Sequence, residues 1–105
     1  MKTMNYKLRY LPLFEQDLIK TVNYIKYVLE SPDAALHLVN DVEAAILKRL
    51  LNPLAFEPYY STKKRKYPYY RIYVKNYVVY YVVIDDIMEV RRLLHGSRDI
   101  DRHLY

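Results

Sequence analysis

Cationic side chains and one imidazole are concentrated near the chain's only glycine, in the last third of the sequence. Residues 91–99 read Arg-Arg-Leu-Leu-His-Gly-Ser-Arg-Asp, and two strand-like runs precede them. Arginine binds phosphates and carboxylates, and histidine exchanges protons near neutral pH. His95 is therefore a candidate general acid or base. A lone histidine at a strand end more often bonds the neighbouring loop, so that role stays open as well.

The run from Tyr69 to Val74 places a second group of cations beside tyrosines. Side chains alternate between the two faces of a strand. One face is then apolar and belongs to the core, whereas the other is cationic and aromatic. The first face carries Tyr70, Ile72 and Val74, and the second carries Arg71, Tyr73 and Lys75. The second face suits phosphate binding and base stacking, and it is also compatible with a solvated strand.

The last strand, predicted from Ile87 to Leu94, has an arginine on its more apolar face. Alternation groups Met88, Val90, Arg92 and Leu94 on that face, and Ile87, Glu89, Arg91, Leu93 and His95 on the other. An unpaired buried charge is very unfavourable. We therefore expect Arg92 to reach the sheet edge or to form an ion pair, with Asp99 or Asp101 as candidate partners.

A basic loop precedes these strands and contains the run Lys63-Lys64-Arg65-Lys66. Residues 61–105 hold ten Lys/Arg and five Asp/Glu, whereas residues 1–60 hold seven of each, so the sheet-rich half carries the whole formal charge of +5. This asymmetry favours a negatively charged partner, which the basic run would attract unless it is only a solvated loop. The residues predicted to bind a target or nucleic acid are Lys63, Lys64, Arg65, Lys66, Tyr73 and Arg92.

Composition limits the classes of function. A chain of 105 residues with 52% hydrophobic and 28% charged residues suits one globular domain, residues 1–105. The absence of cysteine excludes thiolate zinc sites and thiol catalysis, and the three histidines lack the spacing of a metal site. No metal or cofactor is predicted. The N-terminus lacks the apolar stretch of a signal peptide, and no run approaches the roughly 20 apolar residues that span a bilayer. We expect a soluble, cytoplasmic protein.

Hydrophobic periodicity and proline positions predict two helices after a first strand at residues 6–11. Pro12 opens the first helix, whose apolar residues recur at helical spacing. Ser31-Pro32-Asp33 separates the helices, with Ser31 as the expected N-cap, and Asn52-Pro53 ends the second helix. Two helices joined by so few residues should form an antiparallel hairpin.

Three strands follow, separated by turns at Lys75-Asn76 and Asp85-Asp86. Asparagine tolerates a positive φ, so Asn76 is the expected turn residue. Residues 77–84 are almost wholly β-branched or aromatic, as in a central strand that is covered on both faces. The fold class is therefore α+β, in the order β-α-α-β-β-β, with a helical hairpin packed on a small, mostly antiparallel sheet.

The chain resembles the RelE/ParE superfamily, the toxin halves of bacterial type II toxin–antitoxin pairs. The resemblance covers nearly the whole length and is most specific at the C-terminal end. It is carried by Asp17-Leu18, Tyr24-Ile25, Tyr70-Arg71, residues 74–81 and residues 92–99. It implies the same β-α-α-β-β-β fold and a cytoplasmic toxin, whose co-produced antitoxin wraps it with a C-terminal segment.

Two activities occur in the superfamily. RelE-like members cut mRNA on the ribosome by attack of a 2′-OH on the adjacent phosphate, and ParE-like members poison DNA gyrase. Arg71 matches the first basic position of the RelE-like pattern, whereas Tyr73 and Val78 stand where further cations would be expected. A phosphate transition state needs those cations. The Arg-Leu-Leu-His ending and the helical hairpin favour the ParE-like branch.

The resemblance predicts a growth-inhibiting gyrase poison, with a ribosome-dependent mRNA endonuclease as the alternative. A third hypothesis is an inactive relative that only binds its antitoxin. If the protein is a ribonuclease, it is metal-independent, and its catalytic set is Arg71, Lys75, Arg91, His95 and Arg98. The predicted partners are a cognate antitoxin, in a small hetero-oligomer, and either gyrase or the ribosome with its mRNA. The binding segment of the antitoxin should be acidic and carry hydrophobic anchors.

Overall fold

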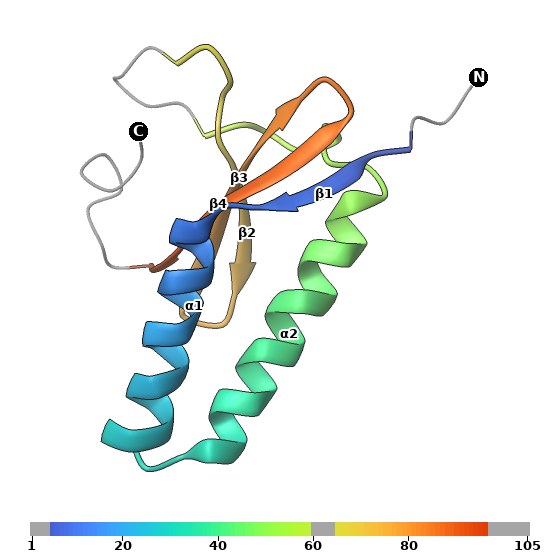
Figure 1. Cartoon of the computed structure of the whole chain (residues 1–105). Coiled ribbons are helices and arrows are strands. Elements are labelled where there is room, and N and C mark those ends of the chain that lie inside the picture. The colour runs from blue at the N-terminus through green and yellow to red at the C-terminus, as the bar shows by residue number, and fades with distance from the viewer. Residues whose placement is uncertain (1–4, 60–64, 97–105) are drawn as a thin grey trace.

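Two helices pack on one face of a four-stranded sheet in the computed structural model, which describes residues 5–59 and 65–96 (Figure 1). The predicted α+β class and the order β-α-α-β-β-β are confirmed. Strand boundaries fall within one residue of the predicted ones, whereas the first predicted helix, which extended through Leu29, consists of an α-helix that ends at Asn23 and a π-helical turn. The elements are β1 Lys7–Tyr10, α1 Pro12–Asn23, a π-helical turn η1 Tyr24–Val28, α2 Pro32–Leu50, β2 Tyr70–Val74, β3 Tyr77–Ile84 and β4 Ile87–His95.

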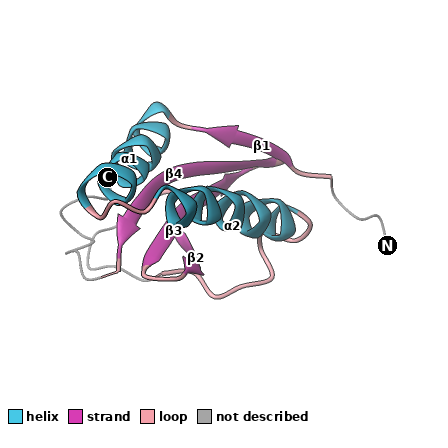
Figure 2. Cartoon of the chain, turned by 90° about the horizontal axis from the view of Figure 1, so that it is seen from below, coloured by secondary structure: helices cyan, strands magenta, loops and turns pink. Residues whose placement is uncertain are grey.

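The strands lie in the order β1-β4-β3-β2 across the sheet (Figure 2). β1 pairs with β4 in parallel, and the other two pairings are antiparallel, so the predicted mostly antiparallel sheet is confirmed. β1 pairs only with Ile87–Val90, because the chain turns into α1 after Tyr10. Among the described residues, the remainder of β4 has no neighbouring strand on that side, and α1 packs against β4 instead.

The helical hairpin forms as its apolar spacing predicts, and its connecting turn projects away from the sheet (Figure 1). Pro12 and Pro32 each begin a helix, where a missing backbone N–H leaves no hydrogen bond unmade. Ser31 occupies the N-cap position of α2, but its side chain makes no capping hydrogen bond. The N-cap prediction is therefore correct for the position and wrong for the bond.

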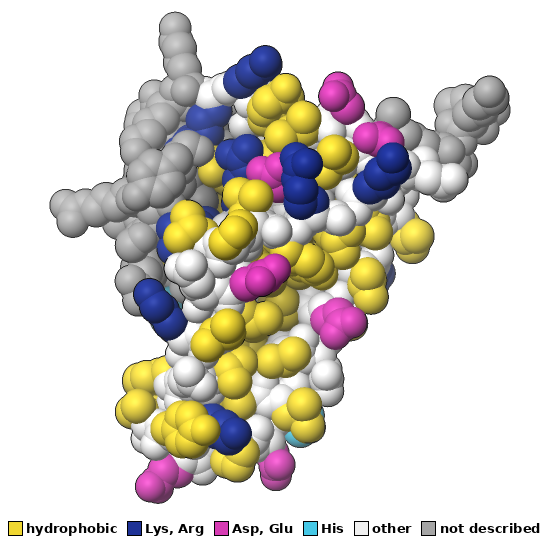
Figure 3. All heavy atoms as spheres, in the orientation of Figure 1, with side chains coloured by type: hydrophobic (Ala, Val, Ile, Leu, Met, Phe, Trp, Pro, Cys, Tyr) yellow, Lys and Arg dark blue, Asp and Glu magenta, His cyan; other side chains and the backbone are white. Residues whose placement is uncertain are grey.

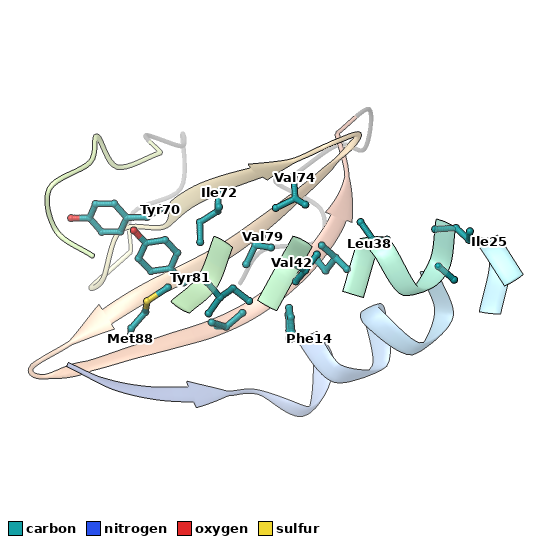
Figure 4. Close-up of a cluster of buried hydrophobic side chains, with 14 residues drawn as sticks. Phe14, Ile25, Leu38, Val42, Tyr70, Ile72, Val74, Val79, Tyr81 and Met88 are labelled. Carbon is teal, nitrogen blue, oxygen red and sulfur yellow. The ribbon is translucent and has the colours of Figure 1, made fainter. Parts of the chain in front are cut away.

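The main core lies between the helices and the sheet, where fourteen buried side chains meet (Figure 4). Tyr70 and Tyr81 stack there, with ring centroids 5.3 Å apart. The Tyr81 hydroxyl donates to the carbonyl oxygen of Pro53 at 2.8 Å and accepts from Arg49 Nη1 at 3.0 Å. Arg49 Nη1 also lies 3.0 Å from the carbonyl oxygen of Arg71. These bonds attach the end of α2 and the following loop to the sheet.

A second, smaller cluster covers the opposite face of the sheet, and its members come from strands and loops. It consists of Tyr69, Val78, Tyr80, Val82 and Leu94, with Tyr59, Tyr67 and Ile84 against it. The backbone N–H of Tyr59 donates to the carbonyl oxygen of Tyr69 at 2.6 Å, which ties the loop to the start of β2. The predicted coverage of the middle strand on both faces is thus confirmed: β3 is buried from Val78 to Val82.

A β-bulge in β4 overturns the predicted division of its side chains. Tyr80 pairs with Arg92 and Tyr81 pairs with Val90, so Arg91 is an extra residue in the ladder. An extra residue exchanges the faces of everything that follows it. Leu93 consequently joins Met88 and Val90 in the main core, and Leu94 lies in the second cluster. Strict alternation had placed Leu94, rather than Leu93, with Met88 and Val90.

The turn at Lys75-Asn76 also differs from the prediction in one detail. The positive φ lies at Lys75 (54°), not at Asn76, and the turn at Asp85 has a φ of 55°. Each costs some strain, because a Cβ atom crowds the backbone in the left-handed region. Within residues 5–59 and 65–96, no helix combines the length and the apolar character that crossing a bilayer requires.

Candidate functional site

Arginines and tyrosines alternate over the face of the sheet that is turned away from the helices. We call this surface the arginine–tyrosine face. Its residues are Arg9, Arg65, Tyr69, Arg71, Tyr73, Tyr80, Glu89 and Arg91. Cross-strand pairing places them together: Arg71 lies opposite Tyr80, and Tyr73 lies opposite Val78 of the second cluster. Glu89 lies opposite Val82, which belongs to the same cluster.

Glu89 is the buried centre of this face, with 5% of its surface exposed. Arg9 Nε donates to Glu89 Oε2 at 2.9 Å, and Arg91 Nε donates to Glu89 Oε1 at 2.9 Å. Burial alone would raise the pKa of Glu89, but the hydrogen bonds from the two guanidiniums outweigh it and lower the pKa. A carboxylate that stays ionised therefore fixes the positions of two cations.

Arg91 joins this ion pair to the aromatic part of the face. Its Nη1 donates to the Tyr69 hydroxyl at 3.3 Å, and its guanidinium carbon lies 5.6 Å from the Tyr69 ring centroid. Burial would lower the pKa of Arg91, but the interactions with Tyr69 and Glu89 raise it. The bulge gives Arg91 this orientation, because the extra residue interrupts the regular alternation of β4.

Arg71 lies among three tyrosines. Its guanidinium carbon is 4.9 Å from the Tyr59 ring centroid and 5.7 Å from that of Tyr73. Burial raises the pKa of the neighbouring Tyr80 to about 12, against the opposing charge of Arg71. Tyr73 is 67% exposed. Within residues 5–59 and 65–96, no carboxylate forms an ion pair with Arg71, so its charge remains available to a partner.

The basic loop is described only in part. The Arg65 guanidinium carbon lies 5.0 Å from the ring centroid of Tyr69, which adds a cation to the same face. Lys66 Nζ lies 5.5 Å from the ring centroid of Tyr67, and Lys66 is exposed. The predicted residues Lys63, Lys64 and Arg98 lie outside the described residues, as do Asp99 and Asp101.

Arg92 is held against α1. Its Nε and Nη2 donate to the two carboxylate oxygens of Asp17, at 2.7 and 2.9 Å. The backbone N–H of Leu93 donates to the same carboxylate at 3.0 Å. Arg92 therefore forms an ion pair, as expected, and its partner on α1 is Asp17. Asp17 thereby accepts the hydrogen bond of the Leu93 backbone N–H, in the part of β4 that has no neighbouring strand among the described residues.

Lys75 and His95 lie at the other end of the sheet, beside a cavity of about 250 Å³. The Nζ of Lys75 forms an ion pair with Asp41 of α2 at 3.2 Å, so the alternation that grouped it with Arg71 ends at Val74. The ring of His95 lies edge-on to Tyr77, with centroids 5.5 Å apart. The cavity is lined by Tyr73, Lys75, Asn76, Tyr77, Val78, His95 and Gly96.

The structure thus separates the sequence-predicted residues that it describes. Arg65, Arg71, Tyr73 and Arg91 lie on the arginine–tyrosine face, Lys75 and His95 lie at the cavity, which Tyr73 also lines, Arg92 lies at α1, and Lys66 lies beside Tyr67. Sequence reasoning missed Arg9, Glu89 and Tyr69 as members of the site. Arg9 and Glu89 are 80 positions apart, and only the parallel pairing of β1 with β4 brings them together. No local pattern carries that signal.

The arginine–tyrosine face carries side chains of the types that bind anions. Guanidiniums bind carboxylates and phosphates, and the exposed ring of Tyr73 offers contact area. Among the described residues, no three His, Asp or Glu side chains are grouped so that they could hold a metal ion.

Comparisons with known proteins concern the family and the fold. The family model of the ParE toxin of the type II toxin–antitoxin system parDE matches residues 8–100. No curated protein matches the sequence. Among solved structures, the fold is similar to a chain of the chromosomal ParDE system from P. aeruginosa, with a TM-score of 0.69, 15% identity, and coverage of 90% of this chain and 99% of that one.

A second similar structure is a chain of the E. coli DinJ–YafQ toxin–antitoxin complex, with a TM-score of 0.56 and 12% identity. The match covers 89% of this chain and 94% of that one. At 15% and 12% identity, these two structures support the fold alone. The family model, which matches residues 8–100, supports membership of the ParE toxin family. The chain belongs to the ParE toxin family of type II toxin–antitoxin systems, within the RelE/ParE superfamily.

Proposed function

We propose that this protein is a cytoplasmic toxin that poisons DNA gyrase by protein–protein contact and is neutralised by a cognate antitoxin. Membership of the ParE family supports the toxin class. The arginine–tyrosine face supports the mode of action, because it offers the Arg71 guanidinium and the exposed ring of Tyr73 to a large partner.

One observation carries the choice of gyrase over RNA cleavage. Tyr73 and Val78, which stand where a RelE-like nuclease would have further cations, are direct cross-strand partners. Val78 is 4% exposed and packs in the second cluster. The positions next to Arg71 on β2 and β3 are therefore neutral, and they lack the cations that would stabilise a pentavalent phosphate there. Such a surface suits the binding of a protein better than catalysis on a phosphate.

A supercoiling assay tests this proposal. Purified toxin is added to gyrase and relaxed plasmid, and the products are examined for lost supercoiling and for trapped, cleaved DNA. We expect both effects, and we expect Arg71→Ala to weaken them while Lys66→Ala, an exposed cation on the neighbouring loop, has a smaller effect. A toxin that leaves gyrase unaffected at concentrations that arrest growth would refute the proposal.

The second candidate function is a metal-independent mRNA endonuclease, and the cavity beside His95 favours it. Tyr73 and Tyr77 supply rings for base stacking, and His95 supplies a proton donor or acceptor next to them. In that reaction a 2′-OH attacks the adjacent phosphate and the 5′-oxygen leaves with a proton, which yields a cyclic phosphate. Cleavage of mRNA on programmed ribosomes, lost in His95→Ala and Arg71→Ala, would establish this activity in place of the first.

The antitoxin is the third element of the proposal. The similar structures are parts of toxin–antitoxin systems, which supports a cognate antitoxin as a partner of this chain. The arginine–tyrosine face favours an acidic segment in that antitoxin, because Arg71 and the neighbouring guanidiniums would pair with its carboxylates. Salt should then slow the association, which stopped-flow mixing at increasing ionic strength measures.

A further inference from the structure

The end of the helical hairpin carries a cluster of exposed apolar side chains, which we call the hairpin tip. Its residues are Tyr24, Tyr27, Val28 and Leu29, which are 50%, 66%, 64% and 55% exposed. All four belong to the π-helical turn η1 or follow it directly. This end of the hairpin projects away from the sheet (Figure 1), and hydrophobic side chains gather there around a cation (Figure 3).

The π-helical turn is the reason that Leu29 is exposed. The apolar stripe of the first helix reaches Ile25, which is 7% exposed, and a continuous α-helix would place Leu29 four residues later on the same stripe. In the structure the backbone N–H of Leu29 donates to the carbonyl oxygen of Tyr24 at 3.1 Å, five residues earlier, as in a π-helix. The wider turn therefore rotates Leu29 away from the core and adds it to the tip.

The connection to α2 is strained. Glu30 has a φ of 51°, in the left-handed region where a Cβ atom crowds the backbone. The backbone N–H of Ser31 donates to the carbonyl oxygen of Ile25 at 3.0 Å, which closes the turn. π-helical turns and strained residues occur frequently at functional sites, where their cost in stability is tolerated. These two features mark the hairpin tip as an interaction surface.

The size of the tip limits the partners that it fits. Its four side chains expose on the order of 400 Å². The largest apolar patch on a typical monomer is roughly 300–600 Å² and is often functional. A stable dimer needs about 800 Å² from each partner, which is roughly twice the area of the tip. The tip is therefore too small to hold a second copy of this chain by itself.

The shape and charge of the tip limit the partners further. A protruding knob is bound by a concave pocket, which a folded protein provides and a short antitoxin segment does not. The groove between the two helices is a different surface, because its lining residues lie at positions 10–18 and 39–46. Lys26 and Glu30 bring opposite charges to the tip, and both are exposed, so charge selects no partner there. Tyrosines that fill a pocket are among the side chains that dominate binding.

We propose that the hairpin tip inserts into an apolar pocket on a folded target protein, with Tyr27 as the central anchor. Under the proposed function, on which this inference rests, that target is gyrase. The toxin then contacts gyrase at two chemically different places. The arginine–tyrosine face contributes cations, whose attraction is screened by salt, whereas the tip contributes apolar burial, which salt does not screen.

A pair of substitutions at the tip tests this proposal in the supercoiling assay. Tyr27→Ser/Val28→Ser removes the two most exposed side chains of the tip. The matched control, Leu51→Ser/Leu54→Ser, removes two side chains just after α2 that are 76% and 50% exposed. Both pairs should unfold at the wild-type temperature, because exposed side chains contribute little to folding. The toxin concentration that halves supercoiling should rise roughly ten- to hundredfold for the tip pair and stay unchanged for the control.

Two further measurements separate apolar burial from other effects of the substitutions. Tyr27→Phe keeps the ring and loses only the hydroxyl, so it should inhibit gyrase as the wild type does. The loss of inhibition in the tip pair should be the same at low and high salt, whereas the loss in Arg71→Ala should shrink as salt is added. A loss in the tip pair that shrinks in the same way would contradict an apolar pocket.

Photo-crosslinking locates the contact on the partner. The photoreactive residue p-benzoylphenylalanine replaces Tyr27 in one preparation and Leu51 in another, and each toxin is irradiated with gyrase and DNA. Mass spectrometry identifies the crosslinked gyrase peptide. We expect a crosslink from position 27 to a single apolar site and none from position 51. A toxin that still inhibits gyrase but gives no crosslink from position 27 would refute the inference.

The same variants detect the other occupants. The antitoxin dissociation constant should change less than about twofold with the tip pair. A loss of antitoxin affinity with inhibition intact would assign the tip to the antitoxin, and a toxin dimer that the tip pair dissociates would assign it to a second copy. Either result overturns the inference. A wild-type toxin that leaves gyrase unaffected counts against the proposed function, whereas a tip pair as inhibitory as the wild type counts against this inference alone.

Discussion

The two faces of the sheet are stabilised in different ways. The helix-covered face is held by burial: Leu38, Val42 and Ile46 of α2 are each no more than 2% exposed. The opposite face combines a smaller buried cluster with directed contacts, in which Glu89 lies between two guanidiniums and Arg71 lies over tyrosine rings. Burial contributes strongly to stability and tolerates exchange among apolar residues of similar size. The directed contacts contribute less, and each requires both of the residues that form it.

This difference suggests that the helix-covered face mainly stabilises the fold, whereas the arginine–tyrosine face is the one that can vary with a binding partner. A surface that contributes little to the free energy of folding can vary with its partner, and a core cannot. The arginine–tyrosine face still has fixed geometry, because the second cluster and the ionised Glu89 hold its cations in place. Fixed cations lose less entropy on binding than mobile ones, which favours tight association.

Removal of a core side chain should have the largest effect on stability. Phe14 is 2% exposed and lies where the first helix meets the sheet, so Phe14→Ala should cost about 3 to 5 kcal/mol of unfolding free energy. Tyr73 is an aromatic residue on the opposite face and is 67% exposed, so Tyr73→Ala should cost less than about 1 kcal/mol. Urea denaturation of both variants measures the contrast. Similar midpoints for the two would contradict the division between the faces.

Removal of the Asp17 carboxylate at the sheet edge should have the second largest effect on stability. Asp17→Asn removes the charge that pairs with Arg92 and weakens the acceptor for the Leu93 N–H, at a cost of about 2 to 4 kcal/mol. Much of this cost is the uncompensated charge of Arg92. The double variant Asp17→Asn/Arg92→Met should therefore be more stable than Asp17→Asn alone. A double variant that is less stable than the single one would show that Arg92 acts independently of Asp17.

The same division explains what the sequence could predict. Proline positions and hydrophobic periodicity placed the four strands and the two helices, but not the π-helical turn η1, because helical spacing does not distinguish that turn from the helix before it. The bulge at Arg91 was missed, since nothing in a run of alternating residues reveals one extra position in the ladder. The partners Arg9 and Glu89 were missed because their contact depends on a parallel crossover. Alternation placed Arg71 and Tyr73 on the same face of β2, as the structure does, because β2 pairs with β3 without a bulge.

The Glu89 network should make stability depend on pH. Its folded pKa lies below the ordinary value of 4.5, so its contribution is fully present above that value. The contribution is lost as the pH falls through the lower folded pKa. Glu89→Gln should cost about 1 to 3 kcal/mol at pH 7 and progressively less below about pH 4.5. Thermal unfolding from pH 7 to pH 3 measures this, with Glu57→Gln as an exposed control. A constant difference between Glu89→Gln and wild type over that range would be inconsistent with the ion pair.

Substitution of Arg71 should have the smallest effect on stability. The same substitution is the most informative about function. Its ring contacts lie at a partly exposed site, so Arg71→Ala should cost about 1 kcal/mol or less, and Arg71→Lys less still. If the face binds the target, Arg71→Ala should nevertheless lose most of the inhibition of gyrase, since its charge has no ion pair among the described residues. Lysine keeps the charge and loses the planar contact with the rings, so Arg71→Lys should recover part of the inhibition. Measured side by side, denaturation midpoints and supercoiling assays would separate the two roles. A loss of inhibition that only follows a loss of folded protein would assign Arg71 to the stability of the sheet.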